Sequence, residues 1–221
     1  GFHLIVSDPT AAVLDEELPD LVAQGCPSLK VYMTYEALKL DDRQMLRVFD
    51  AARRLDAIVL VHAENSDAVA WQTARLLADG KIEPRHHPAS RPAVAEGEAT
   101  GRAIALAGLA GAAVFIVHVS CREALAPIAQ ARARGQRVWA ETCPQYLLLA
   151  AEDMDRPGFE MAAFVCSPPL RSREDQHALW AALASGALDL VSSDHAPYRL
   201  HDAQGKLANG PEAPFTRIPN G

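Results

Sequence analysis

The 221-residue sequence predicts an α/β fold built on a parallel sheet. Short apolar, β-branched runs alternate with longer amphipathic segments, which is the order expected of right-handed βαβ units. In several runs apolar residues occupy both parities, as in strands that are covered on both faces. Repeats of this kind form either a (β/α)8 barrel or a doubly wound sheet.

Six runs are expected to form strands. They lie at residues 2–6, 29–33, 57–61, 113–119, 137–140 and 188–192. Taken as about six βα units, they fall two strands short of an eight-stranded barrel. We therefore expect one partial barrel domain over residues 1–221, with its first strands missing because they precede Gly1.

The segments between these runs carry helical patterns and helix end signals. Residues 40–55 alternate apolar and charged positions, and Asp41 or Asp42 is the expected N-cap. Further helices are expected at residues 67–77, 93–109, 122–134 and 174–184. Gly135 and Gly186 follow the last two as helix stops. A long excursion is expected at 65–91 and a loop at 201–214.

Composition excludes several function classes. The net charge is −7, and no stretch clusters Lys and Arg, so we expect no nucleic acid or membrane partner. No apolar run approaches the roughly 20 residues that a membrane helix needs. The cysteines are dispersed without a CxxC pair, which favours a reducing cytoplasm over a disulfide framework; they are Cys26, Cys121, Cys143 and Cys166.

Three side chains that can bind metals directly follow apolar strand runs: His62, His118 and Asp194. Because the carboxyl ends of parallel strands meet at one face, these groups should share a pocket. Imidazole and carboxylate suit zinc and similar divalent ions. Each residue alone has a plainer interpretation, as a hydrogen-bonded histidine or a helix cap. Together, at one structural position, they favour a metal site.

Lys30 lies between Leu29 and Val31 inside an apolar run. Burial disfavours an ammonium, so it lowers the pKa of a lysine and makes the neutral amine available. A neutral amine can add carbon dioxide and become a carbamate, which is a carboxylate in charge and shape and can bridge two metals. The plainer interpretation is an edge lysine whose ammonium reaches water.

Several segments in the same order resemble the hydantoinase/dihydropyrimidinase family of cyclic amidohydrolases. They are SLKVYMTY at 28–35, VHAEN at 61–65, VHVS at 117–120, ETCPQYL at 141–147, CSPPLR at 166–171, SDHAP at 193–197 and IPNG at 218–221. The resemblance runs nearly end to end. It implies a TIM barrel of the amidohydrolase type and a cytoplasmic enzyme of pyrimidine catabolism that opens hydantoin or 5,6-dihydropyrimidine rings to N-carbamoyl amino acids.

The resemblance also implies the site. Carboxylated Lys30 bridges two divalent ions, most commonly zinc, and His62, His118 and Asp194 are further ligands. A hydroxide shared by the ions attacks the ring amide, Asp194 transfers the proton, and Tyr35 stabilises the oxyanion. Substrate is bound by Tyr35, Ser167 and Asn220.

One departure from the family is plain: the His-x-His motif that supplies two more ligands from the first strand does not occur in this sequence, and His86-His87 is expected in a loop. The chain therefore supplies four of six protein ligands, and alone it is expected to bind metal weakly or to be inactive. The implied assembly of the intact protein is a homotetramer.

Three alternatives stay open. Allantoinase or dihydroorotase would use a similar site on another ring. A non-catalytic scaffold homologue would lack metal. A doubly wound binding domain would not bring the histidines and Asp194 together.

Overall fold

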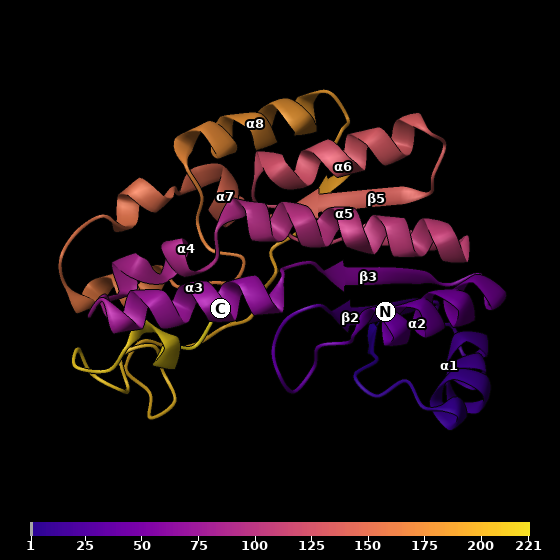
Figure 1. Ribbon diagram of the computed structural model, residues 1–221, viewed down its shortest axis with the longest axis horizontal. Helices are drawn as coiled ribbons and strands as arrows, with labels where there is room; N and C mark the ends of the chain where they lie inside the picture. The colour runs from indigo at the N-terminus through magenta and orange to yellow at the C-terminus, as the bar shows by residue number, and fades with distance from the viewer. Residues whose placement is uncertain (1) are drawn as a thin grey trace.

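Six parallel strands form one open sheet in the computed structural model, which describes residues 2–221 (Figure 1). The strand order is β1-β2-β3-β4-β5-β6, so each strand pairs with its predecessor along the chain. The strands are β1 Leu4–Ile5, β2 Ser28–Tyr32, β3 Ile58–His62, β4 Ala113–Ile116, β5 Val138–Thr142 and β6 Leu190–Val191. The sequential parallel order is that of part of a (β/α)8 barrel and not of a doubly wound sheet, whose order reverses.

Helices connect the strands, and their bounds are α1 Leu18–Ala23, α2 Asp42–Arg54, α3 Ser66–Ala78, α4 His87–Ser90, α5 Ala93–Ala110, α6 Arg122–Ala133, α7 Pro144–Leu148 and α8 Arg173–Ala184. Short segments of other helix types are η1 Val13–Glu17, η2 Pro84–His86, η3 Ala151–Met154, η4 Phe159–Phe164 and η5 Phe215–Arg217. All six expected strands are present, and within residues 2–221 the last of them, β6, is followed by loops and the short helical turn η5.

The long helices cover one face of the sheet. Helices α2, α5, α6 and α8 lie side by side in that order along its outside (Figure 1). In β2 the alternating residues Leu29 and Val31 are fully buried against the helices, whereas Lys30 faces the other side. That inner face borders an open cavity of about 700 Å³ whose apolar lining includes Leu60 and Phe115. Successive apolar residues along the strands therefore point to opposite faces of the sheet, one set towards the helices and the other towards the cavity.

Local sequence signals fix the ends of the helices. Asp41 is the N-cap of α2: its Oδ1 accepts a 2.8 Å hydrogen bond from the Gln44 amide, and Gln44 Oε1 accepts one of 2.9 Å from the Asp41 amide. Gly135 and Gly186, with φ of 78° and 74°, follow α6 and α8 as expected. Such caps typically contribute about 1 kcal/mol.

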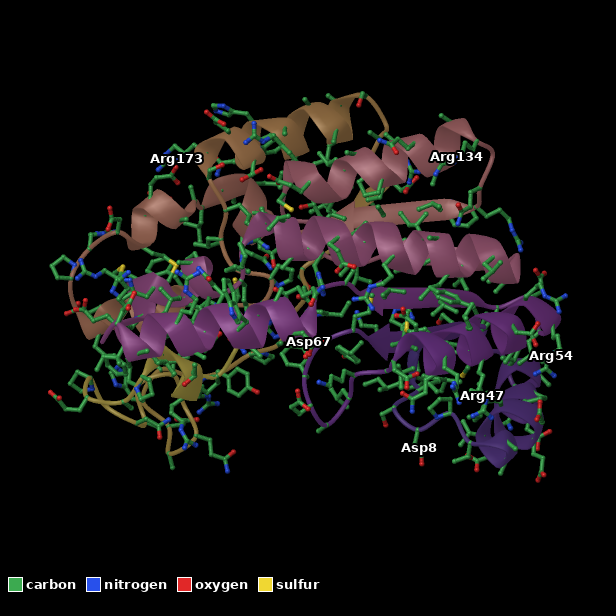
Figure 2. All side chains as sticks on the ribbon, in the orientation of Figure 1. Asp8, Arg47, Arg54, Asp67, Arg134 and Arg173 are labelled. Carbon is green, nitrogen blue, oxygen red and sulfur yellow. The ribbon has the colours of Figure 1, made fainter. Side chains whose placement is uncertain are left out.

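Many of the charged side chains lie at the surface. Arg47, Arg54, Arg134 and Arg173 project from the periphery of the helical layer (Figure 2). Helices within residues 2–221 all fall short of the length and hydropathy that crossing a bilayer requires. All four cysteines are free thiols.

Candidate metal and substrate site

The residues predicted from the sequence meet at the carboxyl ends of the strands. One cavity of about 430 Å³ is lined by all seven of them: Lys30, Tyr35, His62, His118, Ser167, Asp194 and Asn220. Lys30 comes from β2 and His62 is the last residue of β3, while the others lie in loops that follow strands or short helical turns. The two histidines are buried, and Asp194 is exposed at the rim.

Backbone strain gathers at this cavity. Four non-glycine residues among residues 2–221 have positive φ, and three of them line it: Tyr35 at 70°, His118 at 43° and Asp194 at 45°. The fourth, Asp56, is in an exposed turn before β3. Positive φ in a residue with a Cβ costs on the order of 1–3 kcal/mol and persists where surrounding structure enforces it, often at functional sites. His118 lies two residues after the end of β4, and Asp194 lies three residues after the end of β6.

The two histidines face one another. His118 Nε2 lies 2.9 Å from His62 Nδ1, and His62 Nε2 lies 2.7 Å from Glu64 Oε2. Because an ionised carboxylate only accepts, His62 carries its proton on Nε2 and presents the lone pair of Nδ1 to the cavity. Burial lowers the pKa of both imidazoles, so they are neutral at pH 7.

This pair fits a divalent cation. Zinc–nitrogen bonds are about 2.0–2.1 Å long, so two nitrogens on one tetrahedral zinc ion are about 3.3 Å apart. The two facing nitrogens need to separate by only a few tenths of an ångström to reach that value. His118 Nδ1 is buried without a hydrogen-bond partner in the part of the chain that the structure describes. No group of three His, Cys, Asp or Glu side chains in residues 2–221 has metal-site geometry, so Asp194 is not part of a preformed cluster.

Lys30 lies on the inner face of β2. Burial lowers the pKa of its ammonium to about 8, although the charges of Asp194 and Glu141 oppose this shift. Its Nζ lies 5.2 Å from the centre of the Tyr32 ring. A substantial fraction of the side chain is therefore a neutral amine at mildly alkaline pH, the form that can react with carbon dioxide.

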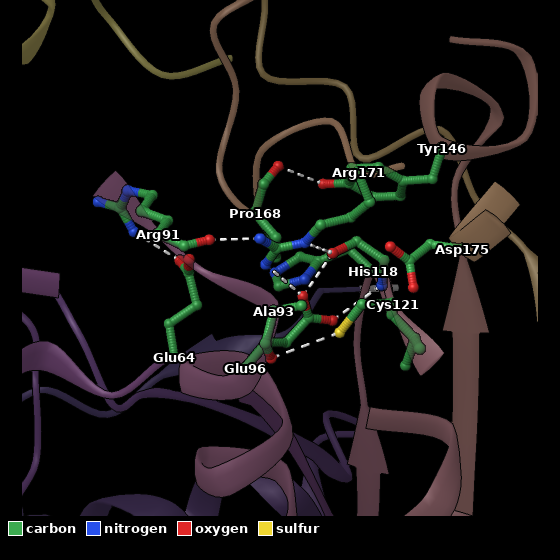
Figure 3. A network of polar contacts seen from close by, with 12 residues as sticks. Glu64, Arg91, Ala93, Glu96, His118, Cys121, Tyr146, Pro168, Arg171 and Asp175 are labelled. Carbon is green, nitrogen blue, oxygen red and sulfur yellow. Dashed lines mark hydrogen bonds and ion pairs between the residues drawn. The ribbon is translucent and has the colours of Figure 1, made fainter. Parts of the chain in front are cut away.

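Behind His62 lies a buried ion pair that the sequence did not predict. Glu64 Oε2 accepts a 2.6 Å hydrogen bond from Arg91 Nη1 (Figure 3). Burial alone would raise the pKa of Glu64, but the Arg91 charge and the His62 hydrogen bond lower it to about 2. The Arg91 guanidinium also lies 5.6 Å from the centre of the Tyr35 ring, so one cation contacts both the histidine support and the tyrosine.

A second buried pair supports the strand end that carries His118. Arg171 Nη2 donates to Glu96 Oε2 at 2.7 Å (Figure 3). Arg171 Nε donates to Ser120 Oγ at 2.9 Å. Arg171 also donates to the carbonyl of Arg91, which joins the two pairs. One feature of the sequence could have indicated these supporting contacts. Glu64 and Ser120 each lie two residues after a predicted metal-binding histidine.

Three groups at the mouth of the cavity have free hydrogen-bonding capacity. Burial, followed by the charge of Glu64, raises the pKa of Tyr35 to about 12, so its hydroxyl stays a donor. Ser167 Oγ is buried and makes no hydrogen bond of good geometry among the described residues, although it lies close enough to the Tyr35 hydroxyl to oppose part of the rise in that pKa. Within residues 2–221, the main-chain N–H and C=O groups of Ser167 and Asn220 make no hydrogen bonds.

The expectation that His86-His87 lies in a loop was wrong. His86 ends η2, and His87 begins α4, is buried and donates from Nε2 to the Cys166 carbonyl at 2.8 Å. Pro84 and Pro88 each fall in the first turn of a helical segment, where the missing N–H is tolerated. His87 therefore supports the segment before Ser167 and takes no part in the contact between His62 and His118.

We compared the sequence and the structure with those of known proteins. No protein-family model matches the chain. The chain is 45% identical over 223 residues to a D-hydantoinase of Geobacillus stearothermophilus, covering all of this chain and 46% of the relative. The crystal structure of a dihydropyrimidinase from Brevibacillus agri NCHU1002 superposes with a TM-score of 0.94 and 48% identity, over all of this chain and 47% of that one. Over its whole length, this chain is therefore similar to about half of a D-hydantoinase and half of a dihydropyrimidinase.

The homology has a defined extent. The chain spans about half the length of the curated relatives it matches. A dihydroorotase from Campylobacter jejuni shares the fold with a TM-score of 0.62, but at 16% identity the likeness is of fold alone. The chain is thus far more similar to the hydantoinases than to this dihydroorotase, and its sheet is the incomplete barrel that the sequence predicted.

Proposed function

We propose that the protein carrying this chain hydrolyses the cyclic amide bond of hydantoins and 5,6-dihydropyrimidines to give N-carbamoyl amino acids. The observation that carries the proposal is the lining of one cavity by all seven residues expected of such a site. Homology to D-hydantoinases and a dihydropyrimidinase over the whole chain supports the same reaction class.

The proposed metal ligands are Lys30 as its carbamate, His62, His118 and Asp194. The facing nitrogens of His62 and His118 and the lowered pKa of Lys30 support this assignment. When bound, two divalent ions, for which we propose zinc, would lower the pKa of a water molecule and polarise the amide carbonyl. The His-x-His ligands are absent from the sequence, so we expect this chain alone to bind metal weakly.

The chain's own groups would then orient the ring. Tyr35 keeps its proton and can donate to the amide oxygen as negative charge develops there. Asp194, at the rim of the cavity, can take a proton and return it to the leaving nitrogen. The free main-chain groups of Ser167 and Asn220 can pair with the N–H and C=O groups on the amide edge of the ring.

A substrate panel tests this function. The intact protein, loaded with zinc, is incubated separately with hydantoin, dihydrouracil, allantoin and dihydroorotate, and N-carbamoyl products are separated by chromatography. We expect turnover of the first two rings. Preferential turnover of allantoin or dihydroorotate would replace the proposal with one of those activities. Purification without zinc together with no turnover would favour a scaffold.

Two properties belong to the same proposal. We propose a homotetramer for the intact protein, which sedimentation at several concentrations would test. We also propose the cytoplasm as its location, because all four thiols are free and two of them, Cys121 and Cys143, are buried.

A further inference from the structure

A second buried lysine lies behind the cavity. Lys206, in the loop after β6, is only 3% exposed. Its Nζ donates hydrogen bonds to the carbonyl oxygens of Val165 and Pro219, the latter at 3.2 Å. Within residues 2–221 it makes no ion pair with a carboxylate, so its partners are main-chain dipoles.

The two carbonyls that Lys206 binds belong to the two segments that carry Ser167 and Asn220. Val165 lies two residues before Ser167, and Pro219 directly precedes Asn220. The segments also touch directly, since the Gly221 amide donates to the Val165 carbonyl at 3.4 Å. We propose that Lys206 is a positioning residue that ties these two segments together and fixes the spacing between the Ser167 and Asn220 main-chain groups that bind the ring.

Other carbonyls around Ser167 are also taken up by buried side chains. His87 donates to the Cys166 carbonyl at 2.8 Å, and the Tyr146 hydroxyl donates to the Pro168 carbonyl at 2.8 Å. The carbonyls of residues 165, 166 and 168 are therefore engaged, and that of Ser167 is left free. A segment that is held on both sides of one unpaired peptide group is preorganised to bind a ligand at that group.

The local fold places Lys206 inward. The loop turns back on itself, with the Lys206 amide bonded to the Arg199 carbonyl and the Leu207 amide to the Leu200 carbonyl, both at 3.0 Å. Gly205 permits this turn, because a Cβ there would lie 2.3 Å from the Arg199 oxygen. The loop thus brings Lys206 to the two carbonyls, and its conformation requires glycine at position 205.

Lys206 and Lys30 are a natural comparison. Burial lowers the pKa of both to about 8. The N–H groups of Lys206 donate to two carbonyl oxygens. A carbamate at that position would place its negative oxygens next to these carbonyl oxygens, and the two would repel. Among residues 2–221 Lys30 has no such acceptors, and it lines the cavity together with His62, His118 and Asp194. The same degree of burial therefore suits Lys206 to tethering and Lys30 to carboxylation.

The proposal rests on the proposed function for the role of Ser167 and Asn220, but the tether can be measured without substrate. In the intact zinc-loaded protein, Lys206→Met removes the donor and keeps the length of the side chain. We expect the KM for dihydrouracil and hydantoin to rise about tenfold while kcat changes by less than about twofold. Hydrogen–deuterium exchange should increase in both 165–169 and 218–221. The control is Lys81→Met, because that lysine is half exposed and pairs only with Asp79 at the surface.

The outcomes separate the alternatives. Unchanged KM and unchanged exchange in Lys206→Met would overturn the proposal, as would a fall in kcat alone, which indicates fewer folded molecules. If Lys206→Met folds poorly, Lys206→Arg, which keeps a cationic donor, should retain the KM of the wild type; a tenfold rise there would overturn the proposal. If the wild type opens no ring, the proposed function fails, and exchange in the two segments still decides whether Lys206 tethers them.

Discussion

The carboxylate of Glu64 lies 2.7 Å from His62 Nε2 and thereby fixes which nitrogen of that imidazole is free for a metal. Carboxylates that accept from the second nitrogen of a metal-binding histidine orient the ring and raise its basicity. Here the carboxylate is itself held by Arg91 at 2.6 Å. The strength of the proposed metal site would therefore depend on Glu64 and Arg91, which are not among its proposed ligands.

Glu64→Gln is expected to weaken zinc binding by about 10- to 100-fold, because the neutral amide holds His62 less firmly. It also leaves Arg91 buried without an anion, which should destabilise the fold by about 3–5 kcal/mol. Zinc titration with a competing chelator and urea unfolding measure the two effects. Glu98→Gln removes a carboxylate from a surface pair with Arg102 and should cost at most about 1 kcal/mol. Equal effects of the two substitutions would contradict this role for Glu64.

Acid should destabilise the metal-free protein in two steps. The folded pKa of His87 is about 4 and its ordinary value is 6.5, so its contribution is present above pH 6.5 and is lost as the pH falls towards 4. The pKa of Glu64 is about 2 against an ordinary 4.5, so its contribution is lost between about pH 4.5 and 2.

Urea unfolding at half-unit pH intervals between 7 and 3 measures this dependence. We expect His87→Gln to flatten the stability profile mainly between pH 6.5 and 4, and Glu64→Gln to flatten it below pH 4.5. A profile for Glu64→Gln that matches the wild type below pH 4.5 would contradict the assignment. Metal-free protein is needed because bound cations add their own proton linkage.

Tyr35→Phe is expected to lower kcat about 10²- to 10³-fold, the usual effect of removing one donor to a developing oxyanion. Stability should change little, because the ring and its contact with His62, 5.1 Å between centroids, remain. Steady-state kinetics on dihydrouracil and a thermal melt make the comparison. Tyr198→Phe, a partly exposed tyrosine on the same cavity, is the control and should keep its kcat. A loss of less than threefold in Tyr35→Phe would exclude the oxyanion role.

Lys30→Ala in the intact protein is expected to abolish zinc binding and ring opening, because the amine that forms the bridging carbamate is gone. In the wild type, the intact mass measured under non-denaturing conditions should exceed the sequence mass by one carbon dioxide. Metal analysis and turnover of hydantoin complete the test, with Lys81→Ala as the exposed control. Turnover in Lys30→Ala equal to that of the wild type would reject the carbamate.

Much of this architecture was accessible from sequence because it depends on local patterns. The strands at Lys30, His62 and His118 follow from apolar runs, and the Asp41 cap follows from residue type and spacing. The sequential parallel order of the six strands follows from the alternation of apolar runs and amphipathic segments.

The supports of the site were not predicted for a different reason. Arg91 and Arg171 meet Glu64 and Glu96 across 27 and 75 residues of sequence. In a sequence, a charged residue is normally expected to be exposed to solvent. Only the folded structure shows that these four residues are buried and paired. Lys206 escaped notice similarly, because nothing in a Gly- and Pro-rich loop indicates a buried cation.

The sequential order of the sheet has a consequence for how this molecule is built. Each strand pairs with the strand that precedes it in the sequence. Its partner has therefore already been synthesised when the strand itself emerges. Native pairing can thus advance from β1 to β6 in the order of translation, and a piece taken from either edge leaves the remaining hydrogen-bonded ladder unbroken.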